Sequence, residues 1–500
     1  MGIIRKQALG NSVFSYLGVL LGYVNVILLF PAFFSSEQFG LIQLLVGVSV
    51  IYAYSGLIGL PNTIVRFFPF YKTEDRYHKG FLSYVFVIGL MGLIIATLLY
   101  LFLKQLIINA YIENSALFVD YYYYLIPLSV FTLLFTVLEA IARALYRTVF
   151  STFLKEVGLR ILTTLGIVLY IFKILDFHSF VVYFIMINFL NALLLLFQVI
   201  FSGEFRFSLG FKDFKFKNLK EFLVFGSFNL LSGTTMLIGH RVDVLMIGSM
   251  VGLSIVGAYS LYFYIASVIY VPMRSMSKIS VSIIANSFKE GNLSHINDIY
   301  KRSSLIQLIF GSLIYIGVII NKHNLFYFIK KPEYIENFGI FYFVGLAILI
   351  DISVGLNSEI ITNSEWYKFD SLFNIILLIV SIIANYLLIP PLGGVGAAIA
   401  AAITFFTFNF LKWIFISIKL KMQPLNHKQL IVILIAIISF IPGYYLPVIS
   451  NIYIDIFYRS TVVTLVYSLL IVLFKVSEDL NERVVVYKNL ILEKLKFAGK

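Results

Sequence analysis

The 500-residue chain contains no cysteine, and only 13% of its residues are charged. Without cysteine there is no disulfide, no thiolate ligand and no thiol nucleophile. The sequence also lacks a glycine-rich phosphate loop, a metal-ligand spacing and a nucleophile elbow, and its hydrophilic stretches are too short for a nucleotide-binding domain. We therefore expect no cofactor, no metal site, no catalytic residues and no ATP-driven pump within this chain.

Apolar residues make up 60% of the chain, and they form about fourteen successive stretches of roughly 20 residues. Backbone amides have no water partners in a bilayer, so a spanning segment is a helix or part of a closed barrel. Long apolar runs without period-two alternation favour helices. The predicted fold class is an all-α integral membrane protein, with spans at 10–33, 39–60, 81–107, 120–142, 157–175, 178–201, 221–247, 254–273, 303–321, 338–360, 369–390, 393–417, 429–447 and 456–475.

The chain is basic, with a formal net charge of +13. Its lysines and arginines are scattered over the loops between spans and form no block, which argues against nucleic acid as a partner. If the N-terminus is cytoplasmic, 31 of the 38 lysines and arginines fall on the inner side. The positive-inside rule then predicts that both termini lie in the cytoplasm.

An internal repeat divides the chain. The segment FGLIQL at 39–44 begins the second predicted span much as VGAYSL at 256–261 begins the eighth, 217 residues later. The same offset aligns spans five and six with spans eleven and twelve, and an even number of helices between the copies gives them the same direction. We therefore predict two parallel six-helix lobes followed by two further helices. The predicted divisions are an N-lobe at 1–202, a cytoplasmic linker at 203–220, a C-lobe at 221–418, two spans within 419–475 and a cytoplasmic amphipathic tail at 476–500.

Arginines at the predicted cytoplasmic end of the N-lobe are candidates for binding an anion. Arg143 and Arg147 follow Glu139 at i+4 and i+8, so the three form one column on the fourth span. The column is either a local ion pair or a site in which Glu139 orients Arg143 while the guanidinium groups hold a phosphate. Arg66 either anchors its loop on the inner side or stands at the same entrance.

Charges inside the predicted spans form a second group of candidates, because each costs roughly 2.5–3.5 kcal/mol at the centre of the bilayer. Arg241 and Asp243, beside His240, lie in the seventh span on opposite sides of the helix, so each needs a partner elsewhere. The sequence is compatible with an interlobe salt bridge at these residues and with a role in ligand binding or gating. Asp351 and Glu359 in the tenth span have no basic neighbour in sequence and are candidates for ion coupling, although Glu359 also fits a simple capping role.

Three motifs follow one another in a fixed order: SSEQFG at 35–40, RVDVLMIG at 241–248 leading into VGAY at 256–259, and IPPLGGVGAA at 389–398. With them, nearly the whole chain resembles the polysaccharide-export flippases of the multidrug/oligosaccharidyl-lipid/polysaccharide exporter superfamily. The resemblance implies two lobes arranged as a V and alternating access. It also implies that undecaprenyl-pyrophosphate-linked oligosaccharides, such as O-antigen, capsule or exopolysaccharide units, move from the inner to the outer leaflet of a bacterial inner membrane.

On this hypothesis the expected partners are the lipid-linked oligosaccharide, membrane lipid and the polymerase or export machinery of a glycan pathway. The alternatives are a lipid II flippase, a cation-coupled multidrug exporter and a membrane-embedded glycan enzyme. An exporter is expected to carry an acidic residue in its first span, and residues 13–34 contain none; an enzyme is expected to have a large outer loop.

The predicted pyrophosphate-binding residues are Arg66, Arg143, Arg147 and Arg241, and the predicted gating or ion-coupling residues are Glu139, Asp243, Asp351 and Glu359.

Overall fold

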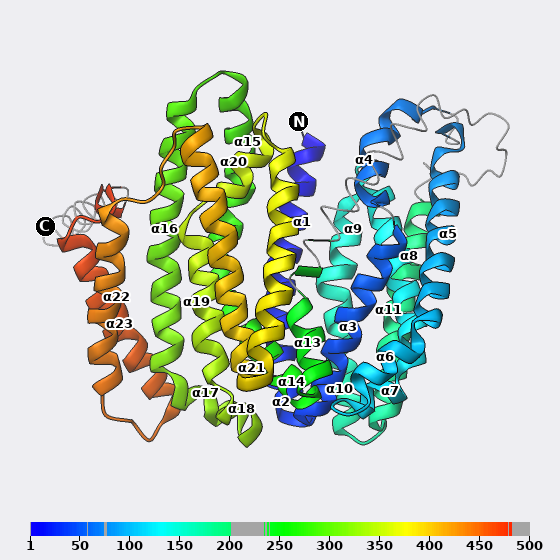
Figure 1. The fold of residues 1–500 in the computed structure, drawn as a ribbon, viewed down its shortest axis with the longest axis horizontal. Helices are drawn as coiled ribbons and strands as arrows, with labels where there is room; N and C mark the ends of the chain where they lie inside the picture. The colour runs from blue at the N-terminus through cyan, green and yellow to red at the C-terminus, as the bar shows by residue number, and fades with distance from the viewer. Residues whose placement is uncertain are drawn as a thin grey trace, which may run out of the picture. The chain divides into compact units, whose positions relative to one another are not determined.

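The computed structural model describes residues 2–57, 59–74, 78–201, 235, 238, 239, 241–478 and 480–482. Within these residues all regular structure is helical, as predicted (Figure 1). The chain forms two compact units: the first comprises Met1–Ile265, Lys331–Ile340 and Asn374–Ala400, and the second comprises the remaining segments. Residues 203–220, most of 221–240 and 483–500 lie outside the described residues, so the predicted lobes, linker and tail stay predictions.

Five helices of the first unit, α1, α3, α5, α8 and α11, are apolar and 20 to 25 residues long, as expected of a chain that crosses a membrane repeatedly. Its elements are α1 (Gly2–Tyr23), the π-helix η1 (Val24–Leu29), α2 (Phe30–Phe33), α3 (Ser36–Leu57), α4 (Leu60–Tyr71), η2 (His78–Gly80), α5 (Phe81–Phe102), α6 (Lys104–Tyr111), α7 (Ala116–Asp120), η3 (Tyr122–Tyr124), α8 (Leu125–Ala144), α9 (Thr148–Phe153), the π-helix η4 (Leu154–Gly158), α10 (Leu159–Ile171), α11 (Phe177–Phe201), α13 (Val242–Met250), α14 (Leu253–Ala266) and α18 (Pro332–Glu336).

The second unit is built in the same way, and one long helix belongs to both units. Its own elements are η5 (Ser267–Tyr270), α15 (Val271–Lys289), α16 (Leu293–Ile320), α17 (Lys322–Ile329), α19 (Gly339–Ser353), α20 (Asn357–Asn363), α22 (His427–Tyr445) and α23 (Ile452–Leu473); the shared helix is α21 (Lys368–Lys419).

Ten helices in the described part of the chain are long and apolar enough to cross a membrane, or eleven if α19 and α20, bent by 44°, count as one span. The sequence predicted about fourteen spans, three more than these eleven. The span at 157–175 corresponds to the shorter α10, the span at 221–247 lies mostly outside the described residues, and α21 contains two predicted spans.

Helix α21 reverses direction near its middle. Gly393 has φ 57° and ψ −134°, which is not a helical conformation. A side chain at Gly396 would come within 1.9 Å of the carbonyl oxygen of Leu388, whereas eight residues of straight helix span about 12 Å. Residues 368–419 therefore form a helical hairpin whose turn follows Pro390 and Pro391, between the predicted spans at 369–390 and 393–417.

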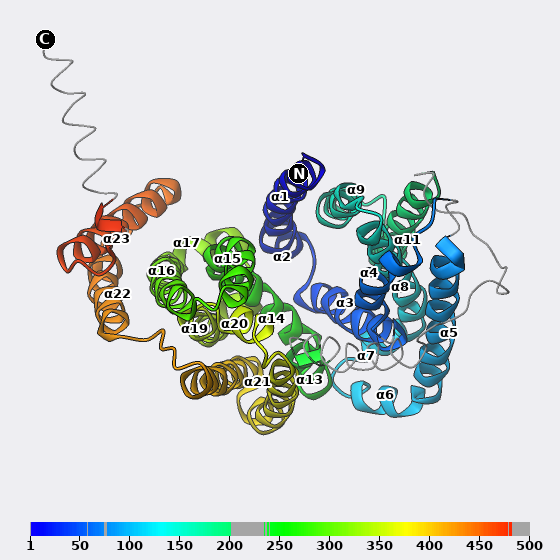
Figure 2. The same ribbon diagram turned by 90° about the horizontal axis from the view of Figure 1, so that it is seen from above.

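Each unit has its own apolar core. In the first unit α8 contacts α3, α4, α5 and α11. In the second unit α16 packs against α22, which packs against α23; these helices lie side by side in both views (Figures 1 and 2). The first core includes Leu57, Ile64, Leu82, Val137, Leu138 and Leu195, and the second includes Ile309, Ile316, Val432, Ile435 and Tyr467.

Helices α3 and α14 cross at a distance that only glycine allows. A Cβ atom on Gly40 would lie 1.9 Å from the carbonyl oxygen of Leu253, and one on Gly257 would lie 2.3 Å from that of Ser36. The hydroxyls of Ser36 and Ser254 form a hydrogen bond of 2.7 Å beside this crossing. Gly40 and Gly257 are the matching glycines of the 217-residue repeat, so the two copies of the motif pack against each other.

Replacing Gly40 with alanine should destabilise the protein by roughly 1–3 kcal/mol, because the added methyl group meets backbone that cannot move aside. The measurement is thermal unfolding of the purified protein in detergent. Gly47→Ala on the same helix is the matched control: its added methyl group lies 3.9 Å from the nearest side-chain atom, and alanine favours a helix by about 0.5–1 kcal/mol. Equal melting temperatures for the two variants would contradict the close crossing.

Candidate functional site

Three of the four candidate arginines lie on the surface of the first unit. Arg66 is exposed on α4, with its Cζ atom 5.7 Å from the centroid of the neighbouring Phe67 ring. Arg143 is exposed in the last turn of α8, and Arg147 is exposed just beyond it. All three side chains are therefore at the surface of the unit, and Arg66 and Arg147 also make contacts within the protein.

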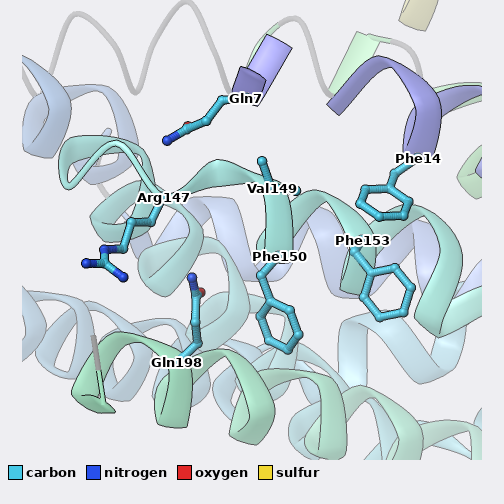
Figure 3. A pocket seen from close by; sticks show the side chains of 7 residues that line it. All are labelled: Gln7, Phe14, Arg147, Val149, Phe150, Phe153 and Gln198. Carbon is cyan, nitrogen blue, oxygen red and sulfur yellow. The ribbon is translucent and has the colours of Figure 1, made fainter. Parts of the chain in front are cut away.

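Arg147 lines an open cavity of about 530 Å³ between α1, α9 and α11 (Figure 3). None of the other three candidate arginines lines this cavity within the described residues, so a single cavity shared by all four arginines stays a prediction. The lining residues are Gln7, Phe14, Arg147, Val149, Phe150, Phe153 and Gln198.

Glu139 pairs with a residue that the sequence did not suggest. Its carboxylate accepts hydrogen bonds from the Lys155 amine at 3.1 and 3.3 Å. Glu139 therefore forms an ion pair between α8 and the π-helix η4, where the sequence analysis considered a partnership with Arg143. The lysine side chain is half exposed, so this ion pair contributes little to stability.

Asp243 is the most completely enclosed of the candidate acids. It is 7% exposed on α13. One carboxylate oxygen accepts a hydrogen bond from the Tyr259 hydroxyl at 2.5 Å, and the other accepts one from the Asn385 amide at 2.9 Å. The asparagine is itself fully buried and also donates to the Ser381 carbonyl oxygen. Helices α13, α14 and α21 are thereby joined around one carboxylate.

Arg241 immediately precedes α13 and is half-buried. It lies near Tyr264, whose ring meets that of Tyr23 edge to face at 6.3 Å. This places the arginine beside α14, next to Tyr264 and not among the partners of Asp243. His240 lies outside the described residues.

Asp351 has the same kind of environment in the second unit. Its carboxylate accepts hydrogen bonds from the Tyr270 hydroxyl at 2.7 Å and from the Asn409 amide at 2.8 Å. Asn409 in turn accepts from the Asn357 amide at 2.8 Å. Each of the two acids thus receives one tyrosine hydroxyl and one asparagine amide, and α21 supplies both asparagines.

Lys412 is a buried cation near the end of the predicted span at 393–417. It lies within α21 and is 1% exposed. Its amine donates to the Asp370 carboxylate at 2.6 Å and to the Ser358 hydroxyl at 2.8 Å, and it lies 4.0 Å from the centroid of the Phe408 ring. Asp370 neutralises the charge of this buried amine.

Glu359 lies next to this group on α20. One of its oxygens accepts a hydrogen bond from the Ser277 hydroxyl. The other is buried and has no hydrogen-bond partner among the described residues. Of the two acids predicted in the tenth span, Asp351 is therefore fully hydrogen-bonded and Glu359 is not.

The end of α13 is held by side chains from the segment between α6 and α7. The last four carbonyl groups of a helix have no amide partner within it. In α13 the Gly248 carbonyl accepts from the Ser115 hydroxyl at 2.5 Å, and the Ser249 carbonyl accepts from the Asn114 amide at 2.9 Å. These contacts fix α13 to the helices that precede α8 in the first unit.

A short segment around α18 adds contacts to the same unit. The Lys331 amine donates to the Phe34 carbonyl oxygen, and burial lowers the pKa of this amine while nearby Glu333 opposes the shift. The Tyr262 hydroxyl donates to the Tyr334 carbonyl oxygen at 2.6 Å. Together these bonds attach the loop before α19 to α2 and α14.

The tyrosine and asparagine partners of the two acids were missed in the sequence. An asparagine within an apolar span is itself a signal, because its amide must find hydrogen-bond partners in hydrocarbon. Asn385 and Asn409 both stand in such surroundings. The acid that each asparagine contacts depends on how the α21 hairpin folds. Residue spacing alone does not predict that fold.

No protein-family model matches this chain, and no curated protein sequence matches it. Its fold is similar to those of solved membrane transporters, one of them described as a member of the MOP superfamily. The chain is similar to the solved structure of the lipid II flippase MurJ in an inward closed conformation, with 17% identity and a TM-score of 0.76 over 93% of this chain and 98% of that one. It is also similar to an inward-facing multidrug resistance MATE family transporter of that superfamily, with 13% identity and a TM-score of 0.66 over 81% of this chain and 94% of that one. At these identities the likeness establishes the fold.

Replacing Asn385 with alanine should destabilise the protein by about 1–3 kcal/mol, because a buried carboxylate loses one of its donors. Thermal unfolding in detergent is again the measurement. Asn188→Ala is the matched control, since the Asn188 amide donates only to the Phe184 carbonyl of its own helix, among the contacts described. If both variants melt at the same temperature, Asp243 does not depend on this amide.

Proposed function

We propose that the protein is a transporter that moves a lipid-linked oligosaccharide from the inner to the outer leaflet of a bacterial inner membrane. The observation that carries this proposal is the likeness over nearly the full length of both chains to a flippase for lipid II. The short outer segments leave no room for a large extramembrane catalytic domain, so the proposal does not include an enzymatic step. Both termini are proposed to lie in the cytoplasm, where the predicted inner loops carry most of the basic residues.

Exposed arginines support an anionic cargo. Arg66, Arg143 and Arg147 all lie at the predicted cytoplasmic end of the first unit, and all are exposed. A guanidinium group matches a phosphate with two parallel hydrogen bonds, and opposite charge lowers the cost of moving a pyrophosphate into a medium of low dielectric. In the proposed function these residues, together with Arg241, bind the pyrophosphate that links the glycan to its lipid.

The contacts at the opposite end of the first unit fit one state of an alternating-access cycle. The crossing of Gly40 with Gly257 and the bonds from Asn114 and Ser115 to α13 lie on the predicted outer side. In the proposed cycle these contacts close the protein toward the outside while cargo enters from the cytoplasm. They then separate to release it, and the binding energy of the cargo favours that change of state.

A cation-coupled exporter is the second candidate, and the buried acids favour it. Asp243 and Asp351 each sit among neutral donors inside apolar helices, and carboxylates in such places commonly serve ion pathways. The likeness to a multidrug transporter of the same superfamily supports this alternative, and the likeness to MurJ supports lipid II itself as a cargo. In the proposed flippase the same acids, with Glu139 and Glu359, serve gating or ion coupling.

Deleting the gene in its bacterial host should leave lipid-linked repeat units trapped on the cytoplasmic side and remove the corresponding surface glycan. Lipid-linked intermediates are measured by extraction and mass spectrometry, and the surface polymer by immunoblotting. A plasmid copy of the gene should restore the polymer. Normal surface glycan together with increased sensitivity to cationic drugs would favour the exporter, and loss of peptidoglycan synthesis would favour lipid II as the cargo.

Neutralising Arg143 or Arg241 should lower the transport rate about tenfold or more, because each removes a charge-assisted hydrogen bond of about 1.5–3 kcal/mol to phosphate. Restoration of surface glycan by plasmid-borne Arg143→Ala and Arg241→Ala in the deletion strain provides the measurement. The control is Lys421→Ala, which removes an exposed loop charge and should retain full activity. Full activity in both arginine variants would rule out the proposed anion site.

A further inference from the structure

A group of charged side chains lies within the second unit, around the amine of Lys412. This residue is on the second arm of the α21 hairpin and is 1% exposed. Its amine donates a hydrogen bond to Asp370, and it also interacts electrostatically with Asp351 and Glu359. Three carboxylates therefore act on one buried ammonium group. Ionisable side chains inside membrane spans are rare and commonly functional, so we examined what this group can do.

Two other basic residues follow Tyr270, the donor to Asp351, along the chain. Arg274 and Lys278 lie four and eight residues after it on α15, and both are exposed. Charges in contact with solvent are screened by water and salt, and buried charges are screened much less. Of these basic residues Lys412 is therefore the one whose charge acts most strongly on the three carboxylates.

The ammonium group is held by three kinds of partner. It donates to the Asp370 carboxylate at 2.6 Å and to the Ser358 hydroxyl at 2.8 Å. It also lies 4.0 Å from the centroid of the Phe408 ring, whose face attracts a cation. A cation from solution must lose its water to enter such a place, whereas the lysine amine loses its water once, when the protein folds.

Glu359 offers the amine a second acceptor. One of its carboxylate oxygens accepts from the Ser277 hydroxyl, and the other is buried without a hydrogen-bond partner among the described residues. Glu359 directly follows Ser358, which already bonds to the amine. A lysine amine stands on a flexible four-carbon stem, so a small movement of the amine or of α20 would exchange one acceptor for the other.

The acceptors on α20 follow a break in the helix. Helices α19 and α20 are bent by 44° where they meet, and Gly355 between them has φ 70°, a conformation that favours glycine. In transporters, broken helices of this kind commonly form the sites of coupling ions. Here Asp351 precedes the break and Glu359 follows it, and the amine of Lys412 interacts with both. A lysine amine therefore stands among the carboxylates of a broken helix, where other transporters bind an ion.

We propose that the Lys412 ammonium group is a tethered cation, which occupies the place of a coupling ion among these three carboxylates. The second unit then takes up no such ion from solution. In the proposed transporter its acids serve gating, and the amine moves from Asp370 toward Glu359 as α20 changes position. This consequence for gating rests on the proposed function, whereas the role of the amine as a tethered cation does not.

Removing the amine should create a site for a cation from solution. Lys412→Ala leaves the carboxylates around an empty space, so the variant should melt below the wild type in choline chloride, whose cation is too large to enter. Added methylammonium or Na⁺ chloride at the same ionic strength should raise its melting temperature by about 2–5 °C more than that of the wild type. The measurement is thermal unfolding of the full-length protein in detergent, and subtracting the wild-type response removes cation effects elsewhere in the protein.

Lys428→Ala is the matched control. Lys428 pairs at 3.2 Å with Glu478, whose side chain is 82% exposed, so water replaces the lost partner and no cation response should appear. Lys412→Met combined with Asp370→Asn is a second variant. It removes both charges of the buried pair and fills the space of the lysine stem, so it should fold and show no more cation response than the wild type.

If Lys412→Ala aggregates in choline chloride, its recovery as a single size-exclusion peak in methylammonium chloride gives the same result. No response beyond that of the wild type, an equal response in Lys428→Ala, or aggregation of Lys412→Ala in every salt would overturn the proposal. These measurements need no cargo. A host whose surface glycan is unaffected by gene deletion would therefore reject the proposed flippase without changing the expected melting temperatures.

Discussion

The close approach of α3 and α14 is the contact on which the position of α14 beside Asp243 depends. In lipid there is no hydrophobic force between helices, because acyl chains are as apolar as leucine, so association rests on backbone proximity and on a few polar bonds. Gly40 and Gly257 provide the proximity, and the hydroxyls of Ser36 and Ser254 provide a bond at the same place. With this crossing set, the start of α14 brings Tyr259 to the carboxylate of Asp243.

The buried acids Asp243 and Asp351 are stabilised by the same kinds of hydrogen-bond donor. A carboxylate inside an apolar helix is costly unless its oxygens are hydrogen-bonded. Asp243 and Asp351 each use a tyrosine and an asparagine, and the asparagines, Asn385 and Asn409, stand on opposite arms of the α21 hairpin. One helical hairpin therefore stabilises an acid in each of the two units, whichever cargo the protein carries.

The sequence predicted the all-helical class and most of the spans, because apolar length and proline or glycine breaks are local properties. The hydrogen-bond and ion-pair partners of individual side chains were harder to predict. Glu139 was considered with an arginine on its own helix, yet Lys155 from the next helix reaches it. Lys412 lies inside the predicted span at 393–417, but the sequence did not indicate that Asp370 neutralises its charge. Asn385 was overlooked because its role depends on which helices meet, and that information is spread over distant parts of the chain.

The double proline in α21 sets the depth of the neighbouring acid in the bilayer. Pro390 and Pro391 have no amide hydrogen, so the carbonyl groups four residues before each lack their usual helical donors. Unpaired carbonyls are costly in hydrocarbon unless protein or water satisfies them, so we expect the turn at the level of water or headgroups. Asn385 is five residues away, or about 7 Å along the helix. We therefore expect the carboxylate of Asp243 to lie shallowly beneath one membrane surface, where an ion would cross only a thin apolar layer to reach it.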